Sequence, residues 1–245
     1  MNKEELAKMI DHSVLHPTTT KKDIEKACKE LFYYGFGTIC VPPAFVLHTA
    51  SYLCLSSSAY ARDANVATVI NFPNGYSQNK ICIEEGLSAF CNGASELDVV
   101  LCHSAIKDTS QKYCSAVINL IDLANQFSLI KEVSIKAIIE TCYLSNEDIY
   151  RVSSELAEAA QLYPIIKFVK TSTGFGSAGA TAEHVALIKK AVGNSLGIKA
   201  SGGIKTWKQC KEMIDAGATR IGTSSGVKII KEFEETEGKN YDCIY

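Results

Sequence analysis

The chain has 245 residues, of which 47% are hydrophobic and 21% are charged, and its formal net charge at pH 7 is −2. This is the composition of an ordinary globular protein, and the lack of a basic field argues against nucleic acid or an anionic membrane surface as a partner. The length suits one α/β barrel, so we expect a single domain over residues 1–245.

Along the chain, short runs rich in Ile, Val, Thr and Cys alternate with longer stretches of helical periodicity. Several of the short runs approach continuous hydrophobicity, which is typical of strands that a parallel sheet buries on both faces. After a helix within residues 1–9, the predicted strands are 10–12, 37–41, 66–71, 96–101, 134–140, 165–170, 197–201 and 219–223.

Local signals mark some of the helices between these strands. Thr20 begins a helical pattern, and Ser145 is an expected N-cap with Asp148 at the capping-box offset. Thr206 begins another helix, which we expect to end near Gly217 because glycine is favoured just after a helix C-terminus. A last helix is predicted over 227–237, followed by a flexible tail over 238–245.

Eight strands that alternate with helices fit either a closed barrel or a doubly wound open sheet. The open sheet usually has a glycine-rich dinucleotide loop after its first strand. Here the first long strand, 37–41, is followed by Pro42 and Pro43 instead. We therefore predict an α/β fold of the (β/α)8 TIM-barrel type.

Charged residues interrupt the apolar strands near their C-terminal ends, where barrel enzymes hold their reactive groups. Asp98 lies within one strand, Lys170 ends another, and Lys199 lies near the end of the next. Two buried lysines on neighbouring strands disfavour each other's charged form, which leaves one amine neutral and able to form an imine with an aldehyde or ketone. A purely structural ion network remains the alternative, and spacing does not say which lysine would be the nucleophile.

Loops of small residues follow the last three strands. They span residues 171–176, 201–204 and 223–226. In a barrel such loops often bind phosphate through backbone N–H groups and a helix N-terminus, and glycine lets the backbone approach the ligand closely. A single Gly-Gly pair would indicate only a turn, but loops at these places in strand order predict a phosphate site.

Eight motifs resemble those of the deoxyribose-phosphate aldolase family, in family order from about residue 10 to 226. They are IDHSVL (10–15), ICVP (39–42), NFPNG (71–75), ELDVV (96–100), IIET (138–141), FVKTSTG (168–174), IKASGGI (198–204) and IGTSS (221–225). The KTSTG and KASGG runs are the most specific. The resemblance implies a class I, Schiff-base aldolase that reversibly cleaves 2-deoxyribose 5-phosphate to glyceraldehyde 3-phosphate and acetaldehyde, in deoxyribonucleotide catabolism and without a cofactor or metal.

The resemblance also implies roles for individual residues. Lys170 is similar to the Schiff-base lysine, Lys199 to the neighbour that lowers its pKa, and Asp98 to the acid/base partner that acts with a water molecule. Some family members end on a tyrosine that helps to move a proton, as Tyr245 would here. Substrate binding is implied for Asp11, Ser13 (a threonine more usually), Cys40 and Thr173, and phosphate binding for Gly174, Gly202, Gly203, Ser224 and Ser225.

Other polar residues are expected to be structural. His12 and His16 are four residues apart, but Pro17 and the strand before it argue against a helix that would align them on a metal. Lys136 and Glu140 alternate inward on one strand, where we expect an ion network. None of the ten cysteines forms a C-x-x-C pair, and we expect reduced thiols.

The N-terminus has no apolar segment of a secretory signal, and no apolar run is long enough to span a bilayer, so we expect a cytoplasmic protein. The expected partner is a small sugar phosphate, and a homo-oligomer is compatible with the sequence. Three other functions stay open at this point: a Schiff-base aldolase for a longer sugar phosphate, a barrel that only binds a phosphorylated ligand, and an isomerase that forms no imine.

Overall fold

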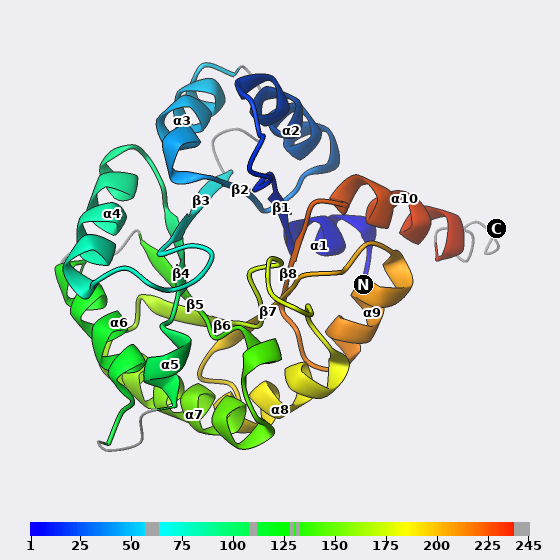
Figure 1. The fold of residues 1–245 in the computed structure, drawn as a ribbon. Helices are drawn as coiled ribbons and strands as arrows, with labels where there is room; N and C mark the ends of the chain where they lie inside the picture. The colour runs from blue at the N-terminus through cyan, green and yellow to red at the C-terminus, as the bar shows by residue number, and fades with distance from the viewer. Residues whose placement is uncertain (57–63, 108–111, 128–129, 131–132, 238–245) are drawn as a thin grey trace.

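The computed structural model describes the chain except for residues 57–63, 108–111, 128–129, 131–132 and 238–245. Eight parallel strands close into a barrel in the order of the sequence, and β8 pairs with β1 (Figure 1). The predicted (β/α)8 barrel is therefore confirmed, and the open sheet is excluded. The strands are β1 (Ile10–Ser13), β2 (Thr38–Val41), β3 (Asn65–Ile70), β4 (Glu96–Val100), β5 (Ser134–Ile138), β6 (Ile166–Lys170), β7 (Gly197–Ser201) and β8 (Arg220–Thr223).

All eight predicted strands are present, and most ends agree within one residue. The largest difference is in β5, which ends at Ile138 although the pattern predicted a strand up to residue 140. Glu140 has a φ of 50°, in the left-handed region that a strand cannot use, and a short 3-10 turn (Thr141–Tyr143) follows it. The local backbone conformation, rather than hydrophobicity, ends this strand.

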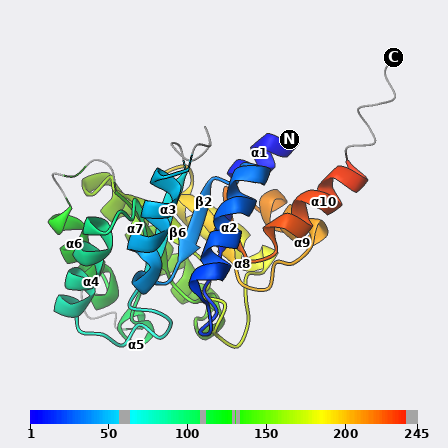
Figure 2. The ribbon, with the colours of Figure 1, turned by 90° about the horizontal axis from the view of Figure 1, so that it is seen from above.

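Helices surround the barrel (Figure 1). They are α1 (Lys3–Lys8), α2 (Lys21–Tyr34), α3 (Val46–Cys54), α4 (Asn79–Cys91), α5 (His103–Ile106), α6 (Ser115–Gln126), α7 (Asn146–Leu162), α8 (Ala182–Val192), α9 (Trp207–Asp215) and α10 (Gly226–Thr236). In the view from above, α1 lies on the same side of the molecule as α10, and Lys3 forms an ion pair with Glu234 of that helix (Figure 2).

The predicted helix starts are confirmed in atomic detail. The side chains of Thr20, Ser145 and Thr206 each accept a hydrogen bond from the backbone N–H three residues further on. Such caps satisfy amide groups that a helix leaves without partners at its N-terminus, and each stabilises the helix by about 1 kcal/mol. None of the helices that the structure describes is long and apolar enough to cross a membrane.

Side chains alternate along each strand between the layer that faces the helices and the inside of the barrel. The side chains that face the helices form the main apolar core, to which β4 contributes Leu97 and Val99. Inside the barrel, by contrast, β4 places Glu96 and Asp98, both buried. The outward face of β4 therefore contributes to the hydrophobic core, while its inward face carries charged groups.

Candidate active site

Seven charged side chains point into the barrel from six of its strands. Asp98 and Lys136 are direct partners in the pairing of β4 with β5, and Lys170 and Lys199 are direct partners in the pairing of β6 with β7. Close-packed parallel strands thus bring together residues that are far apart in the sequence. The complete set is Asp11, Glu96, Asp98, Lys136, Lys170, Lys199 and Arg220.

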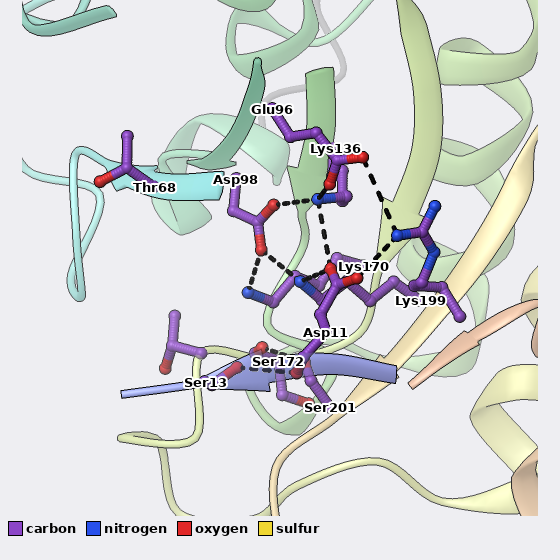
Figure 3. A network of polar contacts seen from close by, with 12 residues as sticks. Asp11, Ser13, Thr68, Glu96, Asp98, Lys136, Lys170, Ser172, Lys199 and Ser201 are labelled. Carbon is purple, nitrogen blue, oxygen red and sulfur yellow. Dashed lines mark hydrogen bonds and ion pairs between the residues drawn. The ribbon is translucent and has the colours of Figure 1, made fainter. Parts of the chain in front are cut away.

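Asp98 is at the centre of the network (Figure 3). Its Oδ2 accepts hydrogen bonds from Nζ of Lys170 at 2.7 Å and from Nζ of Lys199 at 2.6 Å. Its Oδ1 accepts a third from Nζ of Lys136 at 2.9 Å. The carboxylate is fully buried, and these three ammonium groups outweigh the effect of burial and hold the pKa of Asp98 well below its usual value.

The other two carboxylates bind the far side of the same cations. Asp11 accepts hydrogen bonds from Lys199 at 2.5 Å and from Arg220 at 2.7 Å. Glu96 accepts a hydrogen bond from Lys136 at 2.5 Å. These contacts hold Lys136 and Lys199 in place and supply the negative charge that a buried ammonium group requires.

The three buried lysines differ in protonation. Burial, together with the nearby Lys199 ammonium, lowers the pKa of Lys170 despite the opposing effect of Asp98. Burial would also lower the pKa of Lys199, but Asp11 and Asp98 reverse this and raise it. In the same way Asp11, Asp98 and Glu96 raise the pKa of Lys136 well above its usual value. Of these three lysines, Lys170 is therefore the one whose amine is easiest to deprotonate.

A cavity of about 390 Å³ opens above this network, and Lys170 lines it. Several residues predicted to bind substrate or phosphate line it too, namely Ser13, Thr173, Gly174, Gly202, Gly203 and Ser224. Three others lie elsewhere. Asp11 is fully buried against Lys199, Cys40 packs with Ala67 and Val69, and Ser225 lines a neighbouring groove between α2 and α10.

Comparison with known proteins identifies the family of the chain. The model of the DeoC/LacD family aldolases matches residues 6–232. The chain belongs to the DeoC/LacD family of aldolases. The family resemblance seen in the motifs, and with it the expected class of enzyme, is confirmed.

Named relatives cover nearly the whole of this aldolase. A deoxyribose-phosphate aldolase of Thermococcus kodakarensis is 44% identical over 232 residues, which are 94% of this chain and 98% of the relative. One from Caldanaerobacter subterraneus is 40% identical over 94% of both chains. Among solved structures, "QR15, an aldolase" is 35% identical, with a TM-score of 0.82 over 96% of this chain and 98% of the other.

The glycine loops along the cavity of the aldolase depend on a glycine that the sequence analysis did not single out. Gly202 has a φ of 84° and lies against residue 179 of the preceding loop. A Cβ atom on Gly179 would lie 2.1 Å from the carbonyl oxygen of Gly202, which is far too close for any side chain. Because both loops need glycine where they meet, no single motif could reveal Gly179. Lys205, which also lines the cavity, was missed because it follows the KASGGI motif instead of belonging to it.

Glu140 also has a role that differs from the one expected. Lys136 takes part in the predicted ion network, but that prediction is wrong for Glu140. In the described part of the aldolase, the Glu140 carboxylate accepts hydrogen bonds from the backbone N–H of Thr173, at 3.1 Å, and from the Thr173 hydroxyl. The hydroxyl oxygen of Thr173 in turn accepts a hydrogen bond from the backbone N–H of Phe175 at 3.0 Å. Glu140 therefore holds the loop that follows Lys170 in position along the cavity.

One further prediction, for His12, can be placed in the structure. Nε2 of His12 donates a hydrogen bond to the carboxylate of Glu30 at 2.8 Å, which fits the expected structural role. Among the described residues, no group of three His, Cys, Asp or Glu side chains is arranged to hold a metal ion. Tyr245, predicted to move a proton, lies outside the described residues of the aldolase.

Proposed function

We propose that this chain reversibly cleaves 2-deoxyribose 5-phosphate to glyceraldehyde 3-phosphate and acetaldehyde through a Schiff base on Lys170. One observation carries the proposal. Of the three lysines inside the barrel, Lys170 is the one that both lines the cavity and has a lowered pKa. The names of the relatives from Thermococcus and Caldanaerobacter support the substrate.

The first step is imine formation. The neutral amine of Lys170 attacks the C1 aldehyde of the open-chain sugar, and loss of water from the resulting carbinolamine gives an iminium ion. Lys199 keeps its proton because its pKa is raised, so an acid is available beside the site where water departs. Asp98, hydrogen-bonded to both lysines, keeps the two nitrogens together throughout this step.

The second step breaks the bond between C2 and C3. A base removes the proton of the C3 hydroxyl, the electrons of the C2–C3 bond move into the iminium, and glyceraldehyde 3-phosphate leaves. The enamine that remains on Lys170 takes up a proton at C2, and water then hydrolyses the iminium to acetaldehyde and the free amine. We assign the proton transfers to Asp98 acting with a water molecule, because its low pKa makes it a carboxylate that can order and polarise water.

The phosphate group is assigned to the far end of the cavity. Backbone N–H groups of the glycine loops and the N-terminal end of α10 offer hydrogen-bond donors to an anion there. Ser224 and Lys205, which can contribute a hydroxyl and an ammonium group, line the same cavity. Binding at this remote group contributes to positioning C1 against Lys170. We further propose that residues 1–245 form a single barrel domain that acts in deoxyribonucleotide catabolism.

Reductive trapping tests the proposal. Borohydride added with deoxyribose 5-phosphate should attach the sugar or its two-carbon product irreversibly to the peptide that contains Lys170, and Lys170→Ala should lose both the label and the cleavage. Acetaldehyde alone should give the same label, which separates this enzyme from an aldolase for longer donors. Label on Lys199 would reverse the roles of the two lysines, and turnover without any label would exclude the imine.

A further inference from the structure

Among the described residues, the charges joined by ion pairs inside the barrel do not balance when every group is ionised. The cations number four (Lys136, Lys170, Lys199 and Arg220) and the carboxylates three (Asp11, Glu96 and Asp98). The fully ionised cluster therefore carries one net positive charge, which is costly in a buried site. If one of the three lysines is neutral, the cluster carries no net charge.

The contacts indicate which lysine gives up its proton. Lys136 lies within 3.3 Å of all three carboxylates, and Lys199 lies within 2.6 Å of two. Arg220 contacts Asp11 at 2.7 Å and lies 3.8 Å from Glu96. Among the described residues, Lys170 forms an ion pair with Asp98 alone, at 2.7 Å, and shares that carboxylate with two other cations. Lys170 is thus the cation with the least compensation.

Two members of the network contribute to this balance without reaching the substrate. Glu96 and Arg220 do not line the cavity, and neither forms an ion pair with Lys170. Arg220 is fixed in place, because its guanidinium group donates a hydrogen bond to the Thr38 hydroxyl at 2.9 Å and lies 5.3 Å from the ring centroid of Phe168. Their strands, β4 and β8, are each two strands away from β6, which carries Lys170.

We propose that Glu96 and Arg220 are positioning residues that set the protonation state of Lys170 through the charge balance of the barrel interior. The inference rests on the proposed function and deepens it. β3 contributes no titratable side chain. Among the described residues, the titratable and charged groups around Lys170 are Asp11, Cys40, Glu96, Asp98, Lys136, Lys199 and Arg220 on the strands, with His16, Glu140 and Lys205 on the loops.

The two substitutions should act in opposite directions. Arg220→Gln removes a positive charge, so the pKa of Lys170 should rise and the acid limb of the kcat/KM profile should move to higher pH. Glu96→Gln removes a negative charge, so the same limb should move to lower pH. With neighbouring strands about 4.8 Å apart, a charge two strands away acts over about 10 Å, and an effective dielectric constant of about 20 gives a shift of about one pH unit.

The experiment compares Glu96→Gln, Arg220→Gln and the double variant with the parent protein. Cleavage of deoxyribose 5-phosphate is measured as kcat/KM from about pH 5 to 10, and thermal denaturation checks the fold of each variant. Arg220→Lys keeps the charge and serves as the matched control, with a profile like that of the parent. Opposite shifts in the single variants, cancelled in the double variant, support the inference.

If Glu96 and Arg220 only stabilise the structure, a different result is expected. Both single variants would then lose activity with the pH profile unchanged, or shifted in the same direction, and either result overturns the inference. Should Arg220→Gln not fold, the direction of the shift in Glu96→Gln decides alone. Borohydride labelling of the parent keeps the two ideas apart: label at Lys170 with an unmoved profile refutes only the charge-balance inference, whereas a parent without label at Lys170 refutes both.

Discussion

Lys199→Met removes the positive charge closest to Lys170 while keeping the length of the side chain. Both nitrogens contact the same Oδ2 of Asp98, at 2.7 and 2.6 Å, so they lie at most about 5.3 Å apart. At an effective dielectric constant of about 20, two unit charges about 5 Å apart repel by about 3 kcal/mol, which corresponds to about two pH units. The pKa of Lys170 should therefore rise by up to about that much in the variant.

The consequence is a loss of activity that depends on pH. Below the pKa of Lys170, a rise of about two units leaves about one hundredth as much neutral amine, and kcat/KM should fall in proportion. At alkaline pH much of the activity should return. Asp11 and Asp98 each keep other cationic partners, so the variant should still fold.

The assay is the pH profile of kcat/KM, measured beside the charge-conserving Lys199→Arg. The arginine variant should keep the position of the acid limb even if its rate falls. A Lys199→Met profile that lies at the same pH as that of the parent, or at lower pH, would refute the electrostatic explanation. Lys199 would then act only as a proton donor or as a packing group.

Four further predictions concern the walls of the cavity and the end of the chain. Ser224→Asp places a carboxylate against the phosphate, so KM for deoxyribose 5-phosphate should rise about tenfold or more while KM for unphosphorylated deoxyribose stays nearly constant; equal changes for both sugars would remove Ser224 from the phosphate site. Gly179→Ala forces the loop of Gly202 to move. We expect the unfolding free energy to fall by about 1–3 kcal/mol and KM to rise. A melting curve and a KM like those of the parent would show that the two loops accommodate the added methyl group without cost. Glu140→Gln weakens two charge-assisted hydrogen bonds from Thr173, so kcat/KM should fall about tenfold. Glu140→Asp should not restore the activity, because its shorter side chain cannot reach Thr173. Full activity in Glu140→Asp would contradict this geometry. Tyr245→Phe should slow proton exchange at the methyl group of acetaldehyde in deuterated water without affecting imine trapping; exchange at the parental rate would leave Asp98 and water as the proton path.

The fold was predictable because its determinants are local. Buried parallel strands produce short apolar runs, and capping residues such as Ser145 and Thr206 act on amides only three positions away. A reader of the sequence can recognise both without knowing the tertiary structure. The end of β5 was misplaced because the left-handed conformation of Glu140 has no signature in the pattern of apolar residues.

The candidate site was predictable in its members but not in its connections. Asp98, Lys170 and Lys199 stood out because charges are unusual in buried strands. That one carboxylate binds three lysines depends on pairings between residues up to 101 positions apart. The same holds for Gly179 and Glu140, whose roles arise only where two loops meet. Contacts of this kind come from barrel closure, which no local pattern encodes.

The network is divided unevenly along the chain. Its carboxylates, Asp11, Glu96 and Asp98, all belong to β1 and β4, in the first half of the barrel. Its cations all belong to β5 through β8, in the second half. Each half alone would bury charges of one sign, so neither a separate half-barrel nor a symmetrical pair of identical halves can compensate its interior. The two halves are electrostatically complementary, and closing the barrel brings the carboxylates of the first half against the cations of the second.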